Sequence, residues 1–301
     1  MRVGIIGLGK IGGAVVERLV LAGHEVYGYD TAADAASKAQ DLGAKYVESL
    51  EQLAKHVRIF WLFVPAGAII DDILREIIPH MKAGDIVIDG GNSKYTDSII
   101  RARMLVLNSI FFLDCGTSGG LQGRGNGFCL MVGGDQDAYT KIRPLLQDVA
   151  AQGGLAHVGQ SGSGHYVKMV HNAIEYGMMQ AYAEGMQLLK EGSFKDQYLN
   201  LEEITRIWQH GSIIRSWLLE LTHSVFEQDQ KLEYVVGHID ETGTGRWAVE
   251  DAQSHNIPVP VIQSALEARA QSRETEGTNY AAKLIALLRY EFGGHPYKKK
   301  H

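Results

Sequence analysis

The stretch GIIGLGKIGGAVVERL, residues 4–19, decides the fold of this chain. The apolar residues before Gly7 are typical of a buried strand, and those after Gly12 have the spacing of a helix. Gly7, Gly9 and Gly12 form a G-x-G-x-x-G pattern between the two. In this pattern the first glycine permits a tight turn, the second lets the backbone approach a pyrophosphate, and the third allows close helix–strand packing. Because the helix N-terminus adds free N–H groups and positive potential, the loop predicts a dinucleotide-binding site rather than a structural turn.

A second predicted strand, EVYGY, ends at an acid, Asp30. An acid about 20 residues after such a loop can accept hydrogen bonds from the ribose hydroxyls. Its charge would also repel a 2′-phosphate, so the sequence favours NAD, and the nearby Lys38 leaves NADP possible. The predicted cofactor residues of this half-site are Gly7, Leu8, Gly9, Lys10, Ile11, Gly12 and Asp30.

The first half of the chain alternates short β-type runs with helical patterns. The runs are VGII, EVYGY, IFWLFV, DIVID, IFFLD and FCLMV, and several are continuously apolar, as parallel strands covered on both faces are. This alternation predicts an α/β Rossmann-type doubly wound sheet. It stops at GQSGSGH, residues 159–165, which we interpret as a hinge, and helical patterns dominate afterwards. We therefore expect a dinucleotide-binding domain at 1–160 and an all-α domain at 161–301.

Composition narrows the possible functions. The formal net charge is −6, so there is no broad basic field to hold nucleic acid or an anionic membrane. The longest apolar run, IFWLFVPAGAII, contains Pro65 and is too short to span a bilayer. The chain begins at once with a strand pattern, so we expect no signal peptide. Cys115 and Cys129 lack metal-ligand spacing, which predicts reduced thiols, a cytoplasmic protein and no metal site.

A second informative stretch is VKMVHNAIEYGMM, residues 167–179, which carries polar side chains within an apolar helical pattern. A helix advances about 100° per residue, which places its polar residues on one arc of about 140°. These residues are Lys168, His171, Asn172, Glu175 and Tyr176. A solvated face would instead repeat Lys/Glu pairs, so we interpret the arc as functional. A desolvated lysine can lose its proton and serve as a base, and an acid two turns along reaches the same substrate. One of these two groups could accept a hydroxyl proton, and the other could deliver a proton to a carbanion-like intermediate.

Five segments, in order along the chain, are similar to those of one enzyme family. They are IDGGNSKYTDS (88–98), FLDCGTSGGLQGRGNGFCLMVGG (112–134), GHYVKMVHNAIEYGMMQ (164–180), GTGRW (243–247) and RYEFGGH (289–295). The chain thus resembles the decarboxylating 6-phosphogluconate dehydrogenases, in their short form, within the β-hydroxyacid dehydrogenase superfamily. The resemblance implies oxidation of 6-phosphogluconate at C3 with hydride transfer to NAD or NADP, loss of CO2 without a metal, and protonation of the enediol to ribulose 5-phosphate.

The resemblance also implies a role for each matched residue. Lys168 would be the general base for the C3 hydroxyl, Glu175 the general acid for the enediol, and Asn172 a catalytic residue that holds substrate hydroxyls with His171. The other implied residues are Asn92 at the substrate–nicotinamide junction, the carboxylate loop Ser118, Gly119 and Gly120, the phosphate ligands Tyr176, Thr244 and Arg269, and the cofactor loop Val64, Pro65 and Ala66. Arg289 and His295 match tail residues that enter the neighbouring subunit's site, which implies a homo-oligomer, either a dimer or a tetramer, and a helical domain for substrate binding and oligomerisation.

The sequence departs from the family pattern at three positions. Thr242 stands where long-form members carry a phosphate-binding lysine, and Arg246 is close but not equivalent. Thr31 stands where NADP-using members have an arginine after the second strand, which supports NAD. The family's Val-Lys-Ala loop reads Val-Pro-Ala here, with Pro65 at its centre.

Two other functions compete with this interpretation. Another β-hydroxyacid dehydrogenase, such as one acting on 3-hydroxyisobutyrate, would share the glycine loop, the S-G-G turn and a catalytic lysine. It would not need Glu175, Tyr176 or Arg269, so these residues favour a phosphorylated sugar acid. A non-catalytic nucleotide-sensing module would tolerate the loss of Lys168 and Glu175.

Overall fold

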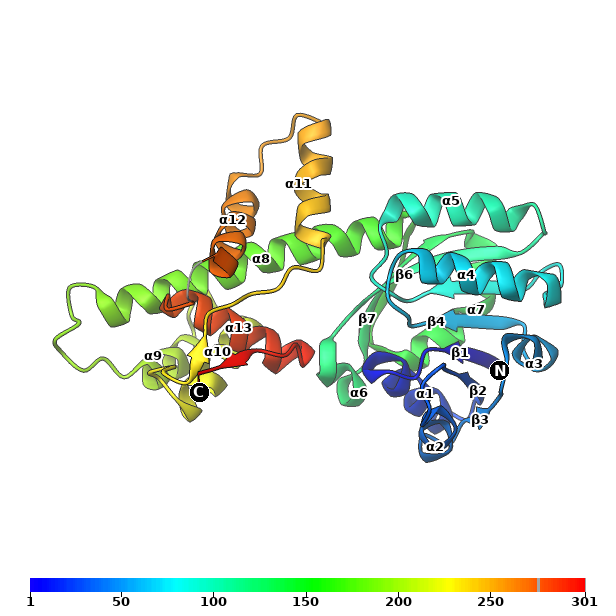
Figure 1. Ribbon diagram of the computed structural model, residues 1–301, viewed down its shortest axis with the longest axis horizontal. Coiled ribbons are helices and arrows are strands. Elements are labelled where there is room, and N and C mark those ends of the chain that lie inside the picture. The colour runs from blue at the N-terminus through cyan, green and yellow to red at the C-terminus, as the bar shows by residue number, and fades with distance from the viewer. Residues whose placement is uncertain (275–276, 301) are drawn as a thin grey trace. The chain divides into compact units, whose positions relative to one another are not determined.

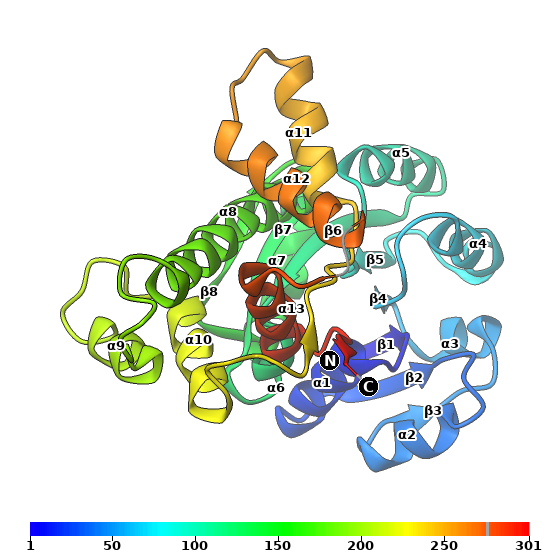
Figure 2. The same cartoon turned by 60° about the vertical axis from the view of Figure 1, so that its left-hand side comes forward.

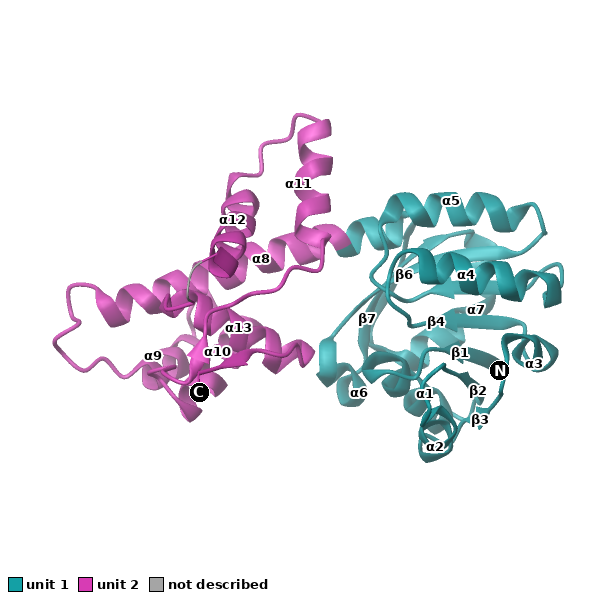
Figure 3. Cartoon of the chain, in the orientation of Figure 1, with its two compact units in different colours: residues 1–168 teal, residues 169–301 magenta. Residues whose placement is uncertain are grey.

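The computed structural model describes residues 1–274 and 277–300. The chain divides into two compact units, residues 1–168 and 169–301 (Figure 3). The junction falls inside one helix, α8 (Ser163–Glu191). The boundary predicted at residue 160 lies just before this helix, and the predicted hinge segment, residues 159–165, spans the end of β8 (Ala150–Gly159) and the first residues of α8.

Unit 1 is built on an eight-stranded sheet with the order β3-β2-β1-β4-β5-β6-β7-β8 (Figure 1). Besides β8, its strands are β1 (Arg2–Ile6), β2 (Glu25–Tyr29), β3 (Lys45–Tyr46), β4 (Ile59–Leu62), β5 (Ile86–Asp89), β6 (Phe111–Ser118) and β7 (Phe128–Gly134). All pairs are parallel except β6–β7. Because crossovers run to both sides of β1, the sheet is doubly wound and the predicted fold class is confirmed.

The helices of unit 1 cover both faces of this sheet (Figures 1 and 2). They are α1 (Lys10–Leu21), α2 (Ala35–Asp41), α3 (Leu50–His56), α4 (Ala68–Ile77), α5 (Tyr95–Val106), α6 (Gly123–Asn126) and α7 (Gln136–Val149), with single 3₁₀ turns at Ile78–His80 and Gly120–Gln122. Side chains of α1 and α7 form one core with one face of the sheet, and those of α3, α4 and α5 form a second core with the other. Strands β4 and β5 are therefore buried along their whole length, as their continuous apolar runs predicted.

Unit 2 is mainly helical. Besides most of α8 it contains α9 (Leu201–Trp208), α10 (Trp217–Gln228), α11 (Thr244–Ser254), α12 (Pro260–Glu274) and α13 (Tyr280–Gly293). Its core joins Met179, Ala183 and Met186 of α8 to apolar residues of α10 and α13. Helices α11 and α12 lie side by side (Figures 1 and 2). The predicted helical second domain is confirmed, although it also holds a small antiparallel ribbon of β9 (Val235–Val236) and β10 (Lys298–Lys299). Within the described part of the chain, no helix has the length and apolar character needed to cross a bilayer.

Candidate active site

The loop of residues 7–12 has the shape that a pyrophosphate-binding turn needs. Gly7 has φ of 98°, and a Cβ there would lie 2.4 Å from the carbonyl oxygen of Phe63. A Cβ at Gly12 would lie 2.0 Å from the carbonyl oxygen of Gly7, which shows how closely the helix approaches the turn. At Gly9, the N-cap of α1, no described atom lies within 4 Å of the Cβ position. The N-terminus of α1 therefore opens onto free space, and the loop fits an NAD pyrophosphate.

Asp30 follows β2 and is tied to the same loop. Its Oδ2 accepts the N–H of Leu8 at 2.6 Å, and its Oδ1 accepts the N–H of Ala32 at 2.9 Å. Each carboxylate oxygen keeps a further lone pair, so the acid can still accept from a ribose hydroxyl. Lys38 lies 2.9 Å from Asp34, so its charge is largely compensated in place. Of the remaining predicted loop residues, Lys10 is exposed and Ile11 packs partly against the core.

Asn92 and the segment Val64, Pro65 and Ala66 lie in two neighbouring connections after β5 and β4. Asp89, fully buried at the end of β5, accepts the Gly91 N–H at 3.0 Å and the Ser93 hydroxyl at 2.7 Å. These two bonds bracket Asn92 and fix the loop that carries it.

Arg101 of α5 holds these two connections together. Its guanidinium donates to both carboxylate oxygens of Asp71, at 2.7 and 3.2 Å, and to the carbonyl oxygen of Gly67 at 3.0 Å. Its Nη1 lies 3.6 Å from Oδ2 of Asp89. Sequence reasoning missed Asp89 and Arg101. The signal that could have found them is an acid at the end of an otherwise apolar strand, because a buried carboxylate requires a partner.

Lys168 and the predicted carboxylate loop meet on strand β6. A Cβ at Gly116 would lie 2.5 Å from Cβ of Lys168 and 2.8 Å from the carbonyl oxygen of Gly164, so α8 touches the strand backbone there. Two residues further, Ser118 ends β6 and leads into Gly119 and Gly120, which have φ of 130° and 53°. In unit 1, strand β6 thus contacts the predicted base on α8 and leads into this loop, and Lys168 is partly buried.

The rest of the polar arc continues along α8. Nδ1 of His171 lies 3.0 Å from Oδ1 of Asn172 and 4.0 Å from Oε2 of Glu175, and all three residues are partly buried. Lys168 and Glu175 are two turns apart on one side of the helix, which separates their Cα atoms by about 10 Å. The sequence analysis did not anticipate that the apolar stripe of Val170, Ile174 and Met178 would be exposed, by 37%, 53% and 39%.

Tyr176 and two buried arginines form the strongest candidate for an anion site. The guanidinium carbon of Arg269 lies 3.3 Å from the centre of the Tyr176 ring. Arg269 is only 2% exposed, and its Nη2 has no hydrogen-bond partner among the described residues. Burial, helped by the nearby charge of Arg289, lowers the pKa of Arg269 to about 10, so the group stays cationic at neutral pH. Burial also lowers the pKa of Arg289. A bound dianion would relieve both the desolvation and the mutual repulsion of these cations.

The segment that contains Thr244 packs against the same tyrosine. A Cβ at Gly245 would lie 2.5 Å from the Tyr176 ring, and the buried Thr244 begins α11. The hydroxyl oxygen of Thr242 lies 3.4 Å from that of Thr244. Arg246 is exposed and forms an ion pair with Glu241 at 2.9 Å. Its charge is therefore already paired, and it does not take the place of the lysine that long-form members carry at the position of Thr242.

The C-terminal tail lies on unit 2 of its own chain. The N–H of His295 donates to the carbonyl oxygen of Arg289 at 3.4 Å, and its ring centre lies 6.1 Å from that of Phe292. Strand β10 pairs with β9, and the N–H of Lys300 donates to the carbonyl oxygen of Tyr234 at 2.9 Å. Arg289 interacts electrostatically with its own chain's Tyr176 and Glu175. A role of Arg289 and His295 in a neighbouring subunit's site therefore stays a prediction.

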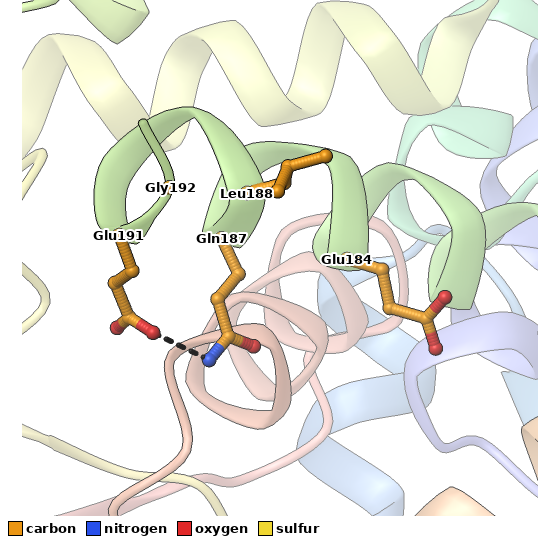
Figure 4. Close-up of a pocket in the computed structure, with 5 residues that line it drawn as sticks. All are labelled: Glu184, Gln187, Leu188, Glu191 and Gly192. Carbon is orange, nitrogen blue, oxygen red and sulfur yellow. Dashed lines mark hydrogen bonds between the residues drawn. The ribbon is translucent and has the colours of Figure 1, made fainter. Parts of the chain in front are cut away.

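A hollow of about 310 Å³ lies near the C-terminal end of α8 (Figure 4). Its lining residues are Glu184, Gln187, Leu188, Glu191 and Gly192. Gln187 donates to Glu191 at 2.7 Å. Its two acids would repel a phosphorylated sugar acid, and no predicted site residue lines it, so we do not assign the substrate there. Across the described ranges, no group of three or more His, Cys, Asp or Glu side chains is arranged to hold a metal ion.

Comparison with known proteins gives the family. The model of the NAD binding domain of 6-phosphogluconate dehydrogenase matches residues 2–162, and the model of the C-terminal domain of 6-phosphogluconate dehydrogenase matches residues 164–300. The chain belongs to the 6-phosphogluconate dehydrogenase family. Its resemblance through five motifs is thereby confirmed.

Three relatives place the chain within this family and its fold. It is 44% identical to the NAD(+)-dependent decarboxylating 6-phosphogluconate dehydrogenase of Haloferax volcanii, over 100% of this chain and 99% of that protein. The Plasmodium falciparum 6-phosphogluconate dehydrogenase has a TM-score of 0.83 at 29% identity, over 91% of this chain and 62% of that longer one. The Mycobacterium tuberculosis 3-hydroxyisobutyrate dehydrogenase has a TM-score of 0.76 at 21% identity, over 96% and 99% of the two chains, which shows a shared fold.

Proposed function

We propose that this chain oxidises and decarboxylates 6-phosphogluconate to ribulose 5-phosphate and CO2, with NAD as the oxidant. The observation that carries the proposal is the constellation on α8. This helix presents Lys168 and Glu175 on one side, and it continues to Tyr176, which contacts the buried cation Arg269. A base, an acid and the tyrosine of the anion site follow one another along the sequence of one helix, in a chain 44% identical to an enzyme named for this activity.

Each residue is then assigned one task. NAD, held by the loop of residues 7–12 and by Asp30, would supply the hydride acceptor for C3 of the substrate. Neutral Lys168 accepts the C3 hydroxyl proton as the C3 carbonyl forms. Its ammonium then stabilises the developing negative charge on that carbonyl oxygen while the C1–C2 bond breaks and CO2 leaves. Glu175 delivers a proton to carbon of the resulting enediol, which yields ribulose 5-phosphate.

The remaining residues bind and orient the substrate. Ser118, Gly119 and Gly120 hold its carboxylate, while His171 and Asn172 hold its hydroxyls. Asn92 lies at the junction with the nicotinamide, and its loop is fixed by Asp89. Tyr176, Thr244, Arg269 and Arg289 hold the phosphate. The proposed phosphate site thus contains two buried arginines, Arg269 and Arg289. Thr242 occupies the position at which long-form members have a third cation, a lysine.

The cofactor preference follows from charge near the ribose. Asp30 is held beside the glycine loop by its bond to the Leu8 N–H, and Asp34 adds a second carboxylate after β2. Lys38 is paired with that acid. A 2′-phosphate would therefore meet negative potential, so NAD is the preferred cofactor and NADP a weaker one.

The assembly and location are further parts of the proposal. Val170, Ile174 and Met178 form an exposed apolar stripe on α8, and such a stripe is suited to burial against a second copy of the chain. We assign a cytoplasmic homo-oligomer, in which tail residues around His295 complete the neighbouring site. Cys115 and Cys129 are both free, which fits a reducing compartment.

The 3-hydroxyisobutyrate alternative is disfavoured by the buried arginines. A substrate without a phosphate would leave the desolvated guanidinium of Arg269 with only Tyr176, Glu175 and Glu241 to offset its charge, so its burial would add nothing to substrate binding. The non-catalytic alternative leaves the placement of Lys168 against β6 unexplained.

One assay tests the proposed function. The purified protein is given 6-phosphogluconate with NAD or with NADP, and reduced cofactor and released CO2 are followed together. We expect both products in equal amounts, with a larger kcat/KM for NAD. Reduced cofactor without CO2 would indicate a plain hydroxyacid dehydrogenase. Absence of turnover with both cofactors would support the sensing module.

The neighbouring-site prediction is tested by mixing inactive variants. Lys168→Met and His295→Ala chains are unfolded together in equal amounts and refolded. In a dimer completed in trans, half of the molecules are hybrids with one intact site, which restores about a quarter of the wild-type activity. The matched control mixes Lys168→Met with Asn172→Ala, whose residues share one helix, and it should restore none. A first mixture as inactive as the control would show that His295 serves its own chain.

A further inference from the structure

Asp114 of strand β6 caps the N-terminus of α8 from outside the helix. It is fully buried, its Oδ1 accepts the N–H of Gly162 at 2.6 Å, and its Oδ2 accepts the N–H of His165 at 2.8 Å. The first N–H groups of a helix have no partner within the helix, so a carboxylate that binds two of them fixes the position of its first turn. The negative charge also opposes the positive end of the helix dipole.

The same strand then contacts the predicted base and the predicted carboxylate loop. Asp114, Gly116 and Ser118 alternate along β6, so they face the same side of the sheet. Gly116 lies against Cβ of Lys168, and Ser118 begins the loop with Gly119. Three alternate positions of strand β6 therefore contact, in turn, the N-terminus of α8, the predicted base Lys168 and the start of the carboxylate loop.

Backbone contacts leave α8 little room to adjust. A Cβ at Gly164 would lie 2.2 Å from the carbonyl oxygen of Asp114, and one at Gly133 would lie 2.6 Å from the N atom of Gly164. The first turn thus rests directly on β6 and β7. His165 adds a side-chain tie, since its Nδ1 lies 2.7 Å from the hydroxyl of Ser98 on α5.

We propose that Asp114 is a positioning residue for the reaction, which sets the rotation and the axial position of α8 and thereby places Lys168 relative to the Ser118 loop. The inference rests on the proposed function of Lys168 as the base. A helix that slips by one residue moves by 1.5 Å and turns by about 100°. A misplacement of about 1 Å can cost a reaction roughly 100-fold in rate.

The test compares two caps of the same chemical kind. Asp114→Asn keeps the shape of the side chain, but its amide turns a donor toward one of the two N–H groups. The control, Asp135→Asn, changes the N-cap of α7, which accepts the N–H of Ala138 at 2.8 Å and lies on a helix with no predicted site residue. Each protein is assayed with 6-phosphogluconate and with its C3-deuterated form, and the KM for NAD is measured.

For Asp114→Asn we expect kcat to fall by about 10- to 100-fold, with the KM for NAD within about twofold of wild type. The isotope effect on kcat should rise, because hydride transfer becomes slower, and the acid limb of the kcat/KM–pH profile should move. Asp135→Asn should keep the wild-type kcat, isotope effect and pH profile. Should Asp114→Asn fail to bind NAD, Asp114→Ser, which keeps one acceptor, replaces it in the same comparison.

An unchanged kcat and isotope effect in the folded variant would overturn the inference, as would equal losses in both variants. The proposed role of Lys168 fails separately, if Lys168→Met turns over near the wild-type rate, and the proposed function fails if the wild type reduces the cofactor without releasing CO2. An inactive Lys168→Met together with an unimpaired Asp114→Asn would sink only the role of Asp114.

Discussion

Lys168→Met should retain NAD binding and lose the oxidation of 6-phosphogluconate. Methionine fills a similar volume against Gly116 of β6 but cannot accept a proton, so the C3 hydroxyl loses its base. Removal of a general base lowers kcat by about 100- to 10,000-fold, and the loss of the ammonium in the decarboxylation step adds to it. The measurement is steady-state kcat, with NAD affinity determined by titration of the free protein.

A matched control lies on the same helix. Lys190 donates to the carbonyl oxygen of Gln230 at 3.2 Å, near the far end of α8. Lys190→Met makes the same substitution at a half-buried lysine of the same helix and should keep kcat within about twofold of wild type, because Lys190 lies 22 residues along the chain from Lys168 and is not a predicted site residue. If Lys168→Met turned over at a comparable rate, the assignment of the base would be wrong.

The fold could be predicted where its signal is local. The glycine loop and the buried strands β4 and β5 can each be recognised from a few adjacent residues. A phosphate-binding turn and a strand covered on both faces each have one characteristic sequence pattern. The sequence did not predict strand β8 because AAQGGLAHVG lies at the sheet edge, is mostly only half-buried and is interrupted by glycine and polar residues, so it has no continuous apolar run.

The candidate site was predictable only in part. The arc from Lys168 to Glu175 follows from helical spacing. The supports of the site join residues far apart in sequence, such as Asp114 with Gly162 beside the arc and Arg101 with Asp71 beside the cofactor loops. No local pattern reports such pairs, because the partner is chosen by the folded sheet. The exposure of the apolar stripe around Ile174 could not be predicted from the sequence either. An apolar residue in a helix has the same pattern whether its own chain or a second chain buries it.

Arg269→Met should lower kcat/KM for 6-phosphogluconate strongly and leave the thermal stability of the protein unchanged. Arg269 is a buried cation with an unsatisfied Nη2, stacked on the Tyr176 ring. Truncation of one partner of a buried charge pair costs about 2–5 kcal/mol, which is roughly 30-fold or more in kcat/KM for 6-phosphogluconate. The unfolding temperature should not fall, since an apolar side chain of similar length removes a desolvated charge whose Nη2 has no hydrogen-bond partner among the described residues.

Two controls, a substrate without the phosphate and a variant of an exposed arginine, test whether Arg269 binds the phosphate. With gluconate, which lacks the phosphate, wild type and Arg269→Met should differ by less than about threefold, because the lost interaction is absent from both reactions. Arg246→Met removes an exposed guanidinium that Glu241 already compensates, and it should leave kcat/KM for 6-phosphogluconate nearly unchanged. An equal loss in Arg246→Met would show that the exposed arginine, rather than the buried pair, replaces the cation missing at Thr242. An equal loss with gluconate would mean that Arg269 supports the fold of the site and does not bind the phosphate.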